Sequence, residues 1–137
     1  MYDSANNTVY VGGDEGNCVI AIDGATNQRI ARIPAGLHGA ALCYNSTENK
    51  VYCANFNSRD VTIVDCSSDS VIATVTAGNG PYVLCYSSQD NKVYCANYYD
   101  GNLTVIDCAT NEATPVSVGW SHYSLCVDER DNLVYAA

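Results

Sequence analysis

The eight cysteines are the residues of this chain most able to do chemistry, as metal ligands, nucleophiles or disulfide partners. They are Cys18, Cys43, Cys53, Cys66, Cys85, Cys95, Cys108 and Cys126. No two of them are spaced as C-x-x-C, and no C-x-x-C-H is present, so neither a zinc ribbon nor a covalent haem is predicted. The two histidines, His38 and His122, do not supply a ligand set, and no metal site is expected.

Four of the cysteines can be paired across two hairpins. If "LCYNSTENKVYCA" at 42–54 folds about Glu48, Cys43 faces Cys53, and the same fold in the next unit sets Cys85 opposite Cys95. Opposed residues of an antiparallel pair have Cα atoms about 4.5 to 5.5 Å apart, which is within the range of a disulfide. The spacing therefore allows two cross-strand disulfides.

The same positions also suit plain packing. Val11 stands where Cys53 and Cys95 recur, and the hairpin rule sets Cys126 opposite Ala136. An exchange of cysteine with valine or alanine is typical of small core positions. Reduced core cysteines and cross-strand disulfides both remain open at this point.

The segments that carry the cysteines repeat every 42 residues. "NKVYCANF" at 49–56 returns as "NKVYCANY" at 91–98, and "VYVGG" at 9–13 is an earlier, weaker copy. Each unit has four short runs rich in Val, Ile, Thr and Tyr, separated by turn residues, so we expect four strands per unit. Four strands in about 40–45 residues is the spacing of a β-propeller blade. The sequence predicts an all-β protein of four-stranded antiparallel blades that form an incomplete ring.

Further segments of the unit carry a family resemblance. "VTIVDC" at 61–66, "LTVIDC" at 103–108 and "VIATVTAGNGP" at 71–81, taken with "VYCAN", resemble the YVTN repeat of β-propellers over nearly the full chain. The resemblance implies strands A to D in each blade, with strand A innermost. The implied units are 1–34 with a truncated A strand, 35–77, 78–119, and 120–137 as an A–B hairpin. Such a chain is expected to be a fragment of a longer propeller or a protomer of a homo-oligomer that completes the ring.

The loops between strands D and A border one mouth of the channel in such a propeller. Here they cover 34–40, 76–82 and 118–124, and their variable positions include His38, Tyr82, Trp120, His122 and Tyr123. Together these residues offer an aromatic wall and a group that titrates near neutral pH, so they are candidates for ligand or partner binding. The other interpretation is that the aromatic residues pack between blades and His122 is solvated.

Two functions from different classes fit this pattern. The first is a non-catalytic scaffold that binds a protein or a small ligand at the channel mouth. The second is an enzyme resembling the lactonases or quinone-dependent dehydrogenases built on related propellers, with Trp120, His122 and Arg59 as candidates. No G-x-S-x-G elbow and no phosphate-binding loop occurs, so no catalytic residue and no cofactor is predicted. The family resemblance favours an extracytoplasmic or cell-surface location, although "MYDSANNTVY" has no signal-peptide pattern.

The charge and the apolar pattern exclude other classes of partner. Fifteen acidic residues against six basic ones give a formal charge of −9, which repels a phosphate backbone and argues against nucleic acid. No run of about 18 apolar residues occurs, so membrane insertion is not expected. Asp23, Asp65 and Asp107 recur at the end of strand C, where we expect them to cap turns.

Overall fold

The computed structural model describes residues 1–13, 16–119 and 123–137, and these form strands joined by short turns. Sheet 1 contains β1 (Tyr2–Asp3), β2 (Thr8–Gly12), β3 (Cys18–Asp23) and β4 (Arg29–Pro34). Sheet 2 contains β5 (Gly39–Asn45), β6 (Lys50–Asn55), β7 (Asp60–Asp65) and β8 (Ser70–Thr76). Sheet 3 contains β9 (Pro81–Ser87), β10 (Lys92–Asn97), β11 (Asn102–Asp107) and β12 (Ala113–Ser117). The C-terminal hairpin consists of β13 (Leu125–Asp128) and β14 (Leu133–Ala136).

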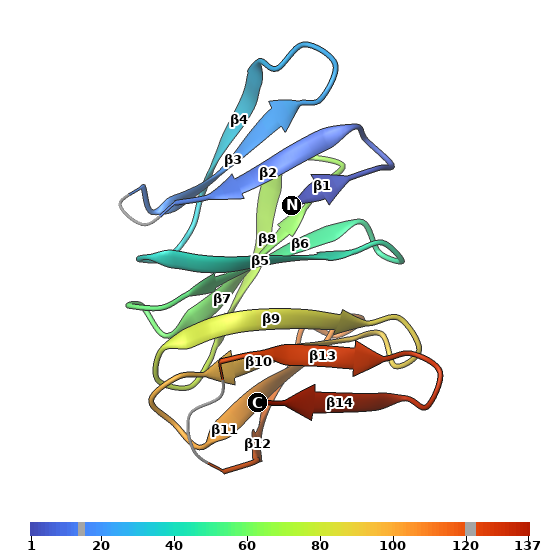
Figure 1. The fold of residues 1–137 in the computed structure, drawn as a ribbon. Coiled ribbons are helices and arrows are strands. Elements are labelled where there is room, and N and C mark those ends of the chain that lie inside the picture. The colour runs from blue at the N-terminus through green and yellow to red at the C-terminus, as the bar shows by residue number, and fades with distance from the viewer. Residues whose placement is uncertain (14–15, 120–122) are drawn as a thin grey trace.

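Each sheet is an antiparallel meander in which neighbouring strands are also neighbours in the chain. Figure 1 shows the three sheets stacked face to face. The first strand of sheet 2, β5, lies next to the first strand of sheet 3, β9, and β13 of the hairpin also contacts β9. The prediction of an all-β chain with four-stranded antiparallel sheets is confirmed. In the described parts of the chain, no helix is long and apolar enough to cross a bilayer.

The described residues form two hydrophobic cores between the sheets. Successive residues of a strand point to opposite faces, so the "KVYCAN" strand of sheet 2 supplies side chains to both cores. Sheets 1 and 2 enclose Tyr10, Val19, Ala21, Ile33, Val51, Cys53, Val64 and Cys66. Sheets 2 and 3 enclose Cys43, Tyr52, Ala54, Val61, Ile63, Val93, Cys95, Ile106 and Cys108. The apolar character of β6 and β7 on both faces therefore reflects a sheet buried on both sides.

The predicted aspartate caps are present in the turns between the third and fourth strands. Asp23 Oδ1 accepts hydrogen bonds from the amides of Ala25 at 2.7 Å and Thr26 at 2.9 Å. Asp107 accepts the corresponding two amides in sheet 3, and Asp65 accepts the Ser68 hydroxyl and the Ser67 amide in sheet 2. These bonds hold the pKa of each of the three carboxyls below its usual range. The recurrent aspartates are thus turn formers, as the sequence predicted.

The predicted register of the β5–β6 hairpin is wrong by one residue. Asn45 pairs with Lys50. The Asn45 carboxamide oxygen closes the turn between them by accepting hydrogen bonds from the backbone amides of Thr47 and Glu48, at 2.9 and 3.0 Å. Cys43 therefore faces Tyr52 and not Cys53. A shift of one residue changes which side chains share a face of the sheet.

This correction also removes the geometric basis of the predicted disulfides. Leu42 is the residue opposite Cys53, so Cys43 and Cys53 lie in different cores, on opposite faces of sheet 2. In sheet 3 the same shift sets Cys85 opposite Tyr94 and Leu84 opposite Cys95. In the C-terminal hairpin, Cys126 faces Tyr135 in place of Ala136. All eight cysteines are free thiols in the structure.

Candidate functional site

Two sets of loops meet at one end of the stacked sheets and form the candidate site. The loop that enters each new sheet is tied to the loop between its second and third strands by backbone hydrogen bonds. The amide of Phe56 donates to the carbonyl of His38 at 2.8 Å, and the amide of Tyr98 donates to that of Gly80 at 2.7 Å. Because the bonds recur in sheets 2 and 3, the repeat places the side chains of both loops side by side.

Among the described residues, six rings from these loops and from the start of β9 form a continuous series of contacts, named here the aromatic surface. It consists of His38, Phe56, Tyr82, Tyr98, Tyr99 and Tyr123. Phe56 is the centre, with ring centroids 5.4 Å from His38 and 5.7 Å from Tyr99. The rings of Tyr98 and Tyr123 meet edge to face at 5.1 Å. Edge-to-face pairs at these distances are favourable beyond the area that they bury.

The aromatic surface is open to solvent on one side. Tyr82, Tyr99 and Tyr123 are 43%, 60% and 59% exposed, whereas Phe56 and Tyr98 are half-buried beneath them. The Tyr123 hydroxyl donates to the Tyr98 hydroxyl at 3.2 Å, and this bond raises the pKa of Tyr98. The exposed rings are therefore held in position by contacts with neighbouring rings.

Buried asparagines fix the loops below the rings. The Asn55 carboxamide donates to Asp60 Oδ1 at 2.6 Å and to Thr62 Oγ1 at 2.8 Å. Asn97 makes the equivalent bonds in sheet 3, to Asn102 Oδ1 at 2.7 Å and Thr104 Oγ1 at 2.9 Å. These bonds explain the asparagine that ends each "VYCAN" strand, because it orients the loop that begins at the next residue.

Gly80 lets the rings approach the backbone. Its φ is +72°, and an added Cβ would lie 3.0 Å from Tyr99 Cδ2 and 3.1 Å from Phe56 Cε2. A residue other than glycine would therefore strain the backbone and displace both rings.

Three of the five predicted site residues contribute to the aromatic surface, namely His38, Tyr82 and Tyr123. Trp120 and His122 lie outside the described residues. Sequence reasoning missed Phe56, Tyr98 and Tyr99, which lie in the loops between the second and third strands. The available signal was the aromatic residue that follows "VYCAN" in two successive repeats, as Phe56 and as Tyr98.

A polar groove of about 660 Å³ adjoins the aromatic surface. Its lining includes Arg59, Asp60, Asn79 and Asp100. The Asp100 carboxylate accepts the amide of Asn79 at 2.6 Å, which fixes one acidic group beside Gly80. Among the residues that the structure describes, no group of three His, Cys, Asp or Glu side chains could hold a metal ion.

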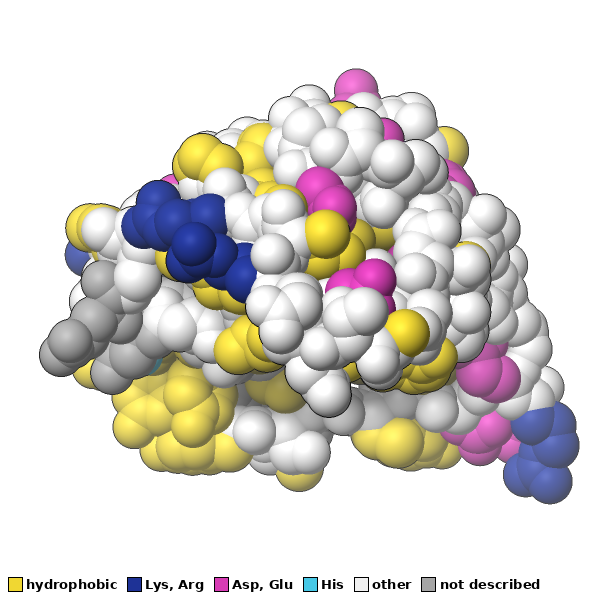
Figure 2. Space-filling model, turned by 90° about the horizontal axis from the view of Figure 1, so that it is seen from above, with side chains coloured by type: hydrophobic (Ala, Val, Ile, Leu, Met, Phe, Trp, Pro, Cys, Tyr) yellow, Lys and Arg dark blue, Asp and Glu magenta, His cyan; other side chains and the backbone are white. Residues whose placement is uncertain are grey.

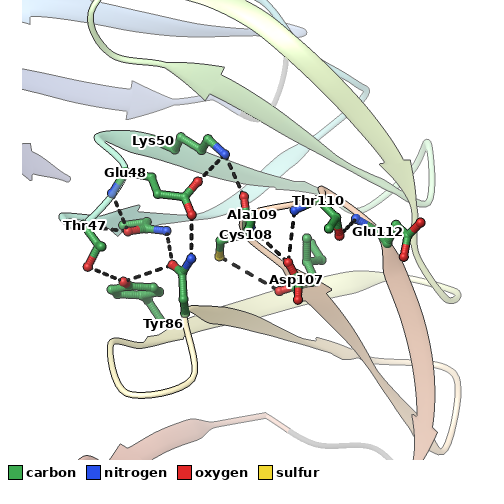
Figure 3. A network of polar contacts seen from close by, with 12 residues as sticks. Thr47, Glu48, Lys50, Tyr86, Asp107, Cys108, Ala109, Thr110 and Glu112 are labelled. Atoms are coloured by element: carbon green, nitrogen blue, oxygen red, sulfur yellow. Dashed lines mark hydrogen bonds and ion pairs between the residues drawn. The ribbon is translucent and has the colours of Figure 1, made fainter.

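A network of titratable side chains joins sheets 2 and 3 (Figure 3). The Lys50 ammonium donates to the Cys108 carbonyl at 2.7 Å and pairs with Glu48, and the Tyr86 hydroxyl donates to Thr47 Oγ1 at 2.7 Å. Although burial opposes it, the bonds from Lys50 and Asn91 keep the pKa of Glu48 below its usual range. The bonds from Lys50 and Tyr86 thus link sheet 2 to sheet 3, which is a structural role.

No family model matches this chain, and no curated protein matches it either. Solved structures do match. A structure of hydrazine synthase from Kuenenia stuttgartiensis superposes with a TM-score of 0.88 at 17% identity, over 95% of this chain and 38% of that one. The dihydro-heme d1 dehydrogenase NirN gives 0.79 at 24% identity, over 100% and 31%. The WD40 repeats of RRP9 give 0.80 at 13% identity, over 91% and 40%.

These likenesses concern the fold. All three are below 25% identity, and the chain spans 31 to 40% of the length of these structures. Two of the structures are named as enzymes and one as a set of WD40 repeats, so these likenesses do not favour either function expected from the sequence. The sheets described here are β-propeller blades of WD40-like architecture, and membership of the YVTN family is not shown.

Proposed function

We propose that this chain is a non-catalytic propeller module whose aromatic surface binds a segment of a partner protein. The observation that carries the proposal is the unbroken series of six rings across sheet 2, sheet 3 and the start of the C-terminal hairpin. Tyrosine is enriched among the residues that dominate binding energy at protein interfaces, where a rigid ring buries a large area at little entropic cost.

The partner segment is expected to carry basic residues. The chain has a formal charge of −9, and two carboxylates line the groove beside the rings, on Asp60 and Asp100. Opposite charge raises the rate of encounter and selects partners. A guanidinium can also stack on an exposed tyrosine ring, which is worth about 0.5–2 kcal/mol.

The test is a selection of random peptides displayed on phage against the immobilised protein. We expect enriched peptides to contain arginine or lysine together with an aromatic or proline residue, and to bind more weakly as salt concentration rises. The Tyr99→Ala variant should lose about tenfold or more in affinity for these peptides, because an anchoring ring is worth at least about 1.4 kcal/mol.

Ile72→Ala provides the matched control. Ile72 is 45% exposed on β8, away from the aromatic surface, and its truncation should leave affinity unchanged. Circular dichroism and thermal melting of both variants show whether the fold is retained. The proposal fails if no peptide is enriched over the bare support, or if the enriched peptides bind Tyr99→Ala as tightly as the wild-type protein.

The enzyme hypothesis receives no specific support from the described residues. Two of its three candidates, Trp120 and His122, lie outside them, and the third, Arg59, lines the groove together with Ser58, Asp60 and Asp100. For this reason we advance the binding function alone.

A further inference from the structure

The interface between successive sheets is built twice in this chain from the same repeat positions. The forward face of a sheet is defined here as the face turned toward the next sheet, and the rear face as the opposite one. Tyr52 and Ile63 lie on the forward face of sheet 2, and Val93 and Ile106 on the rear face of sheet 3 pack against them. Tyr10 on sheet 1 and Val51 on sheet 2 occupy the equivalent places in the other core.

Two tyrosine hydrogen bonds link sheet 1 to sheet 2 in addition to this apolar packing. On the forward face, the Tyr10 hydroxyl donates to Asp69 Oδ1 at 2.7 Å, in the last turn of sheet 2. On the rear face, the Tyr44 hydroxyl donates to Asp3 Oδ1 at 2.7 Å, in the first strand of sheet 1. The interface between sheets 2 and 3 keeps the apolar centre and a rear-face tyrosine bond, from the Tyr86 hydroxyl to Thr47 Oγ1 at 2.7 Å. Among the described residues the Tyr52 hydroxyl on its forward face has no hydrogen-bond partner, so the feature that both interfaces share is an apolar centre with a tyrosine bond from the rear face.

The rear face of sheet 1 presents the same residue types to solvent. Val9 and Val11 stand 42 positions before Val51 and Cys53, and Tyr2 stands 42 positions before Tyr44. Val11 is 43% exposed and Tyr2 is 54% exposed, although Cys53 is fully buried. Figure 2 looks onto this end of the molecule, and hydrophobic side chains show between polar and acidic ones.

The C-terminal hairpin presents a matching forward face. Tyr135 is the repeat equivalent of Tyr10, and with Leu133 and Cys126 it forms an exposed strip on β13 and β14. Tyr135 is 56% exposed and Leu133 is 48% exposed. Asp128, at the end of β13, occupies the position that Asp3 holds in sheet 1.

We propose that the forward face of the C-terminal hairpin binds the rear face of sheet 1 in a second copy of this chain. In this contact the Tyr2 hydroxyl of one copy donates to Asp128 of the next, as Tyr44 does to Asp3. Tyr135 reaches Asn27, the repeat equivalent of Asp69. A second copy is the occupant because one chain carries both complementary halves of the interface that sheets 1 and 2 form within it.

Such a contact joins two different surfaces, so it assembles copies head to tail, as a closed ring or as a longer series. We expect sedimentation velocity at about 0.15 M salt to show a concentration-dependent species of at least twice the monomer mass, since at that ionic strength repulsion between acidic surfaces is largely screened. Val11→Arg on sheet 1 and Tyr135→Asp on the hairpin should each shift the protein to monomer. Ile72→Asp, on the outer strand β8, is the matched control and should leave the association unchanged.

Mixing the two variants gives the sharpest result. A Val11→Arg copy keeps an intact hairpin face and a Tyr135→Asp copy keeps an intact sheet 1 face. An equimolar mixture should therefore form a dimer that neither variant forms alone, and this readout does not depend on either variant being as stable as the wild type. Alkylation of Cys126 should also slow as wild-type concentration rises, since this exposed thiol lies on the proposed contact.

Three outcomes would overturn the inference. One is a wild-type protein that stays monomeric over the concentration range. Another is an association that persists in both variants, which would place the contact elsewhere. The third is a mixture of the two variants that remains monomeric although both keep the circular dichroism spectrum of the wild type.

Discussion

At the scale of single residues, the recurrent cysteines act as small core side chains. Cys53 packs between sheets 1 and 2, whereas Cys43 and Cys95 pack between sheets 2 and 3. Burial raises the pKa of each of these three thiols to about 12. At pH 8 a thiol with that pKa is ionised to only about one part in ten thousand, so it is a poor nucleophile.

This leads to a prediction about alkylation. In the native protein at pH 8 without reductant, iodoacetamide should leave Cys43, Cys53 and Cys95 unmodified over a period in which an unfolded control reacts completely. In denaturant, intact-mass analysis should count eight labels per chain. A count of six or four, rising to eight only with a reductant, would reinstate the disulfides.

The asparagine that follows the cysteine strand carries a second prediction. Asn55→Ala removes the bonds to Asp60 and Thr62 and leaves the Thr62 hydroxyl in the core without that donor. We expect a loss of about 2 kcal/mol in the free energy of unfolding, which corresponds to roughly 5–10 °C in Tm. Asn57→Ala, at an exposed position of the same loop, is the control and should change Tm little. Equal Tm values for the two variants would show that the buried carboxamide is not a stabilising link.

Some single-residue features could be predicted from the sequence and others could not. The capping aspartates were predictable because an Asx turn is a local structure, formed by a side chain and the amides two and three residues later. Phe56 and Tyr98 were not assigned to the site, because their contacts join loops that the repeat brings together only in three dimensions.

At the scale of elements, the strands followed from the pattern, but the register of the hairpins did not. The apolar pattern predicts which residues form a strand. It does not predict which residues of two neighbouring strands pair, because both faces of a buried sheet are apolar and either register would bury apolar side chains. The register of β5–β6 is set instead by the Asn45 carboxamide and by Asn49, whose φ is +54°. These are details of turn geometry that a repeat of 42 residues does not reveal.

Gly80 provides a prediction for the loop that supports the aromatic surface. Gly80→Ala should lower the free energy of unfolding by about 1–2 kcal/mol, since a non-glycine residue at positive φ is strained. Peptide binding should weaken as well, because the new Cβ pushes against Tyr99 and Phe56. Gly13→Ala is the matched control, since an added Cβ meets nothing within 4 Å there. A Gly80→Ala variant that melts and binds like wild type would mean that the rings do not depend on this turn.

The turn of Asp65 provides a prediction for pH dependence. Bonds from the Ser68 hydroxyl and the Ser67 amide lower the pKa of Asp65 in the folded chain. Its stabilising contribution is therefore complete above the unfolded value of about 3.9 and is lost as pH falls through the lower folded value. Asparagine at this position keeps one oxygen that can accept the Ser67 amide, and it carries no charge. The Tm difference between wild type and Asp65→Asn should thus be largest near pH 6 and shrink below about pH 4, and a constant difference would contradict this origin.

At the scale of the whole molecule, stability comes from stacking one sheet on the next. Sheet 2 is buried on both faces, and sheets 1 and 3 share a core only with it among the described residues. This arrangement is close to a linear array, in which each unit is stabilised mainly by its neighbours. The propeller architecture could be predicted from the repeat for the same reason, since a unit that recurs with two apolar faces must stack.

Two buried isoleucines allow the two interfaces to be tested separately. Ile63 lies in the core between sheets 2 and 3, and Ile33 in the core between sheets 1 and 2. Truncation of either isoleucine to alanine should lower the free energy of unfolding by about 2–5 kcal/mol, because it leaves a cavity in a buried core.

Native-state hydrogen exchange can distinguish the two interfaces. Ile63→Ala should reduce the protection of the backbone amides of Ile106 and its neighbours in β11, whereas the amides of β3 should keep their protection. Ile33→Ala should do the reverse, exposing Val19 in β3 first. If both variants lowered protection equally in all three sheets, the stack would unfold as one unit, and the interfaces could not be treated as separate sources of stability.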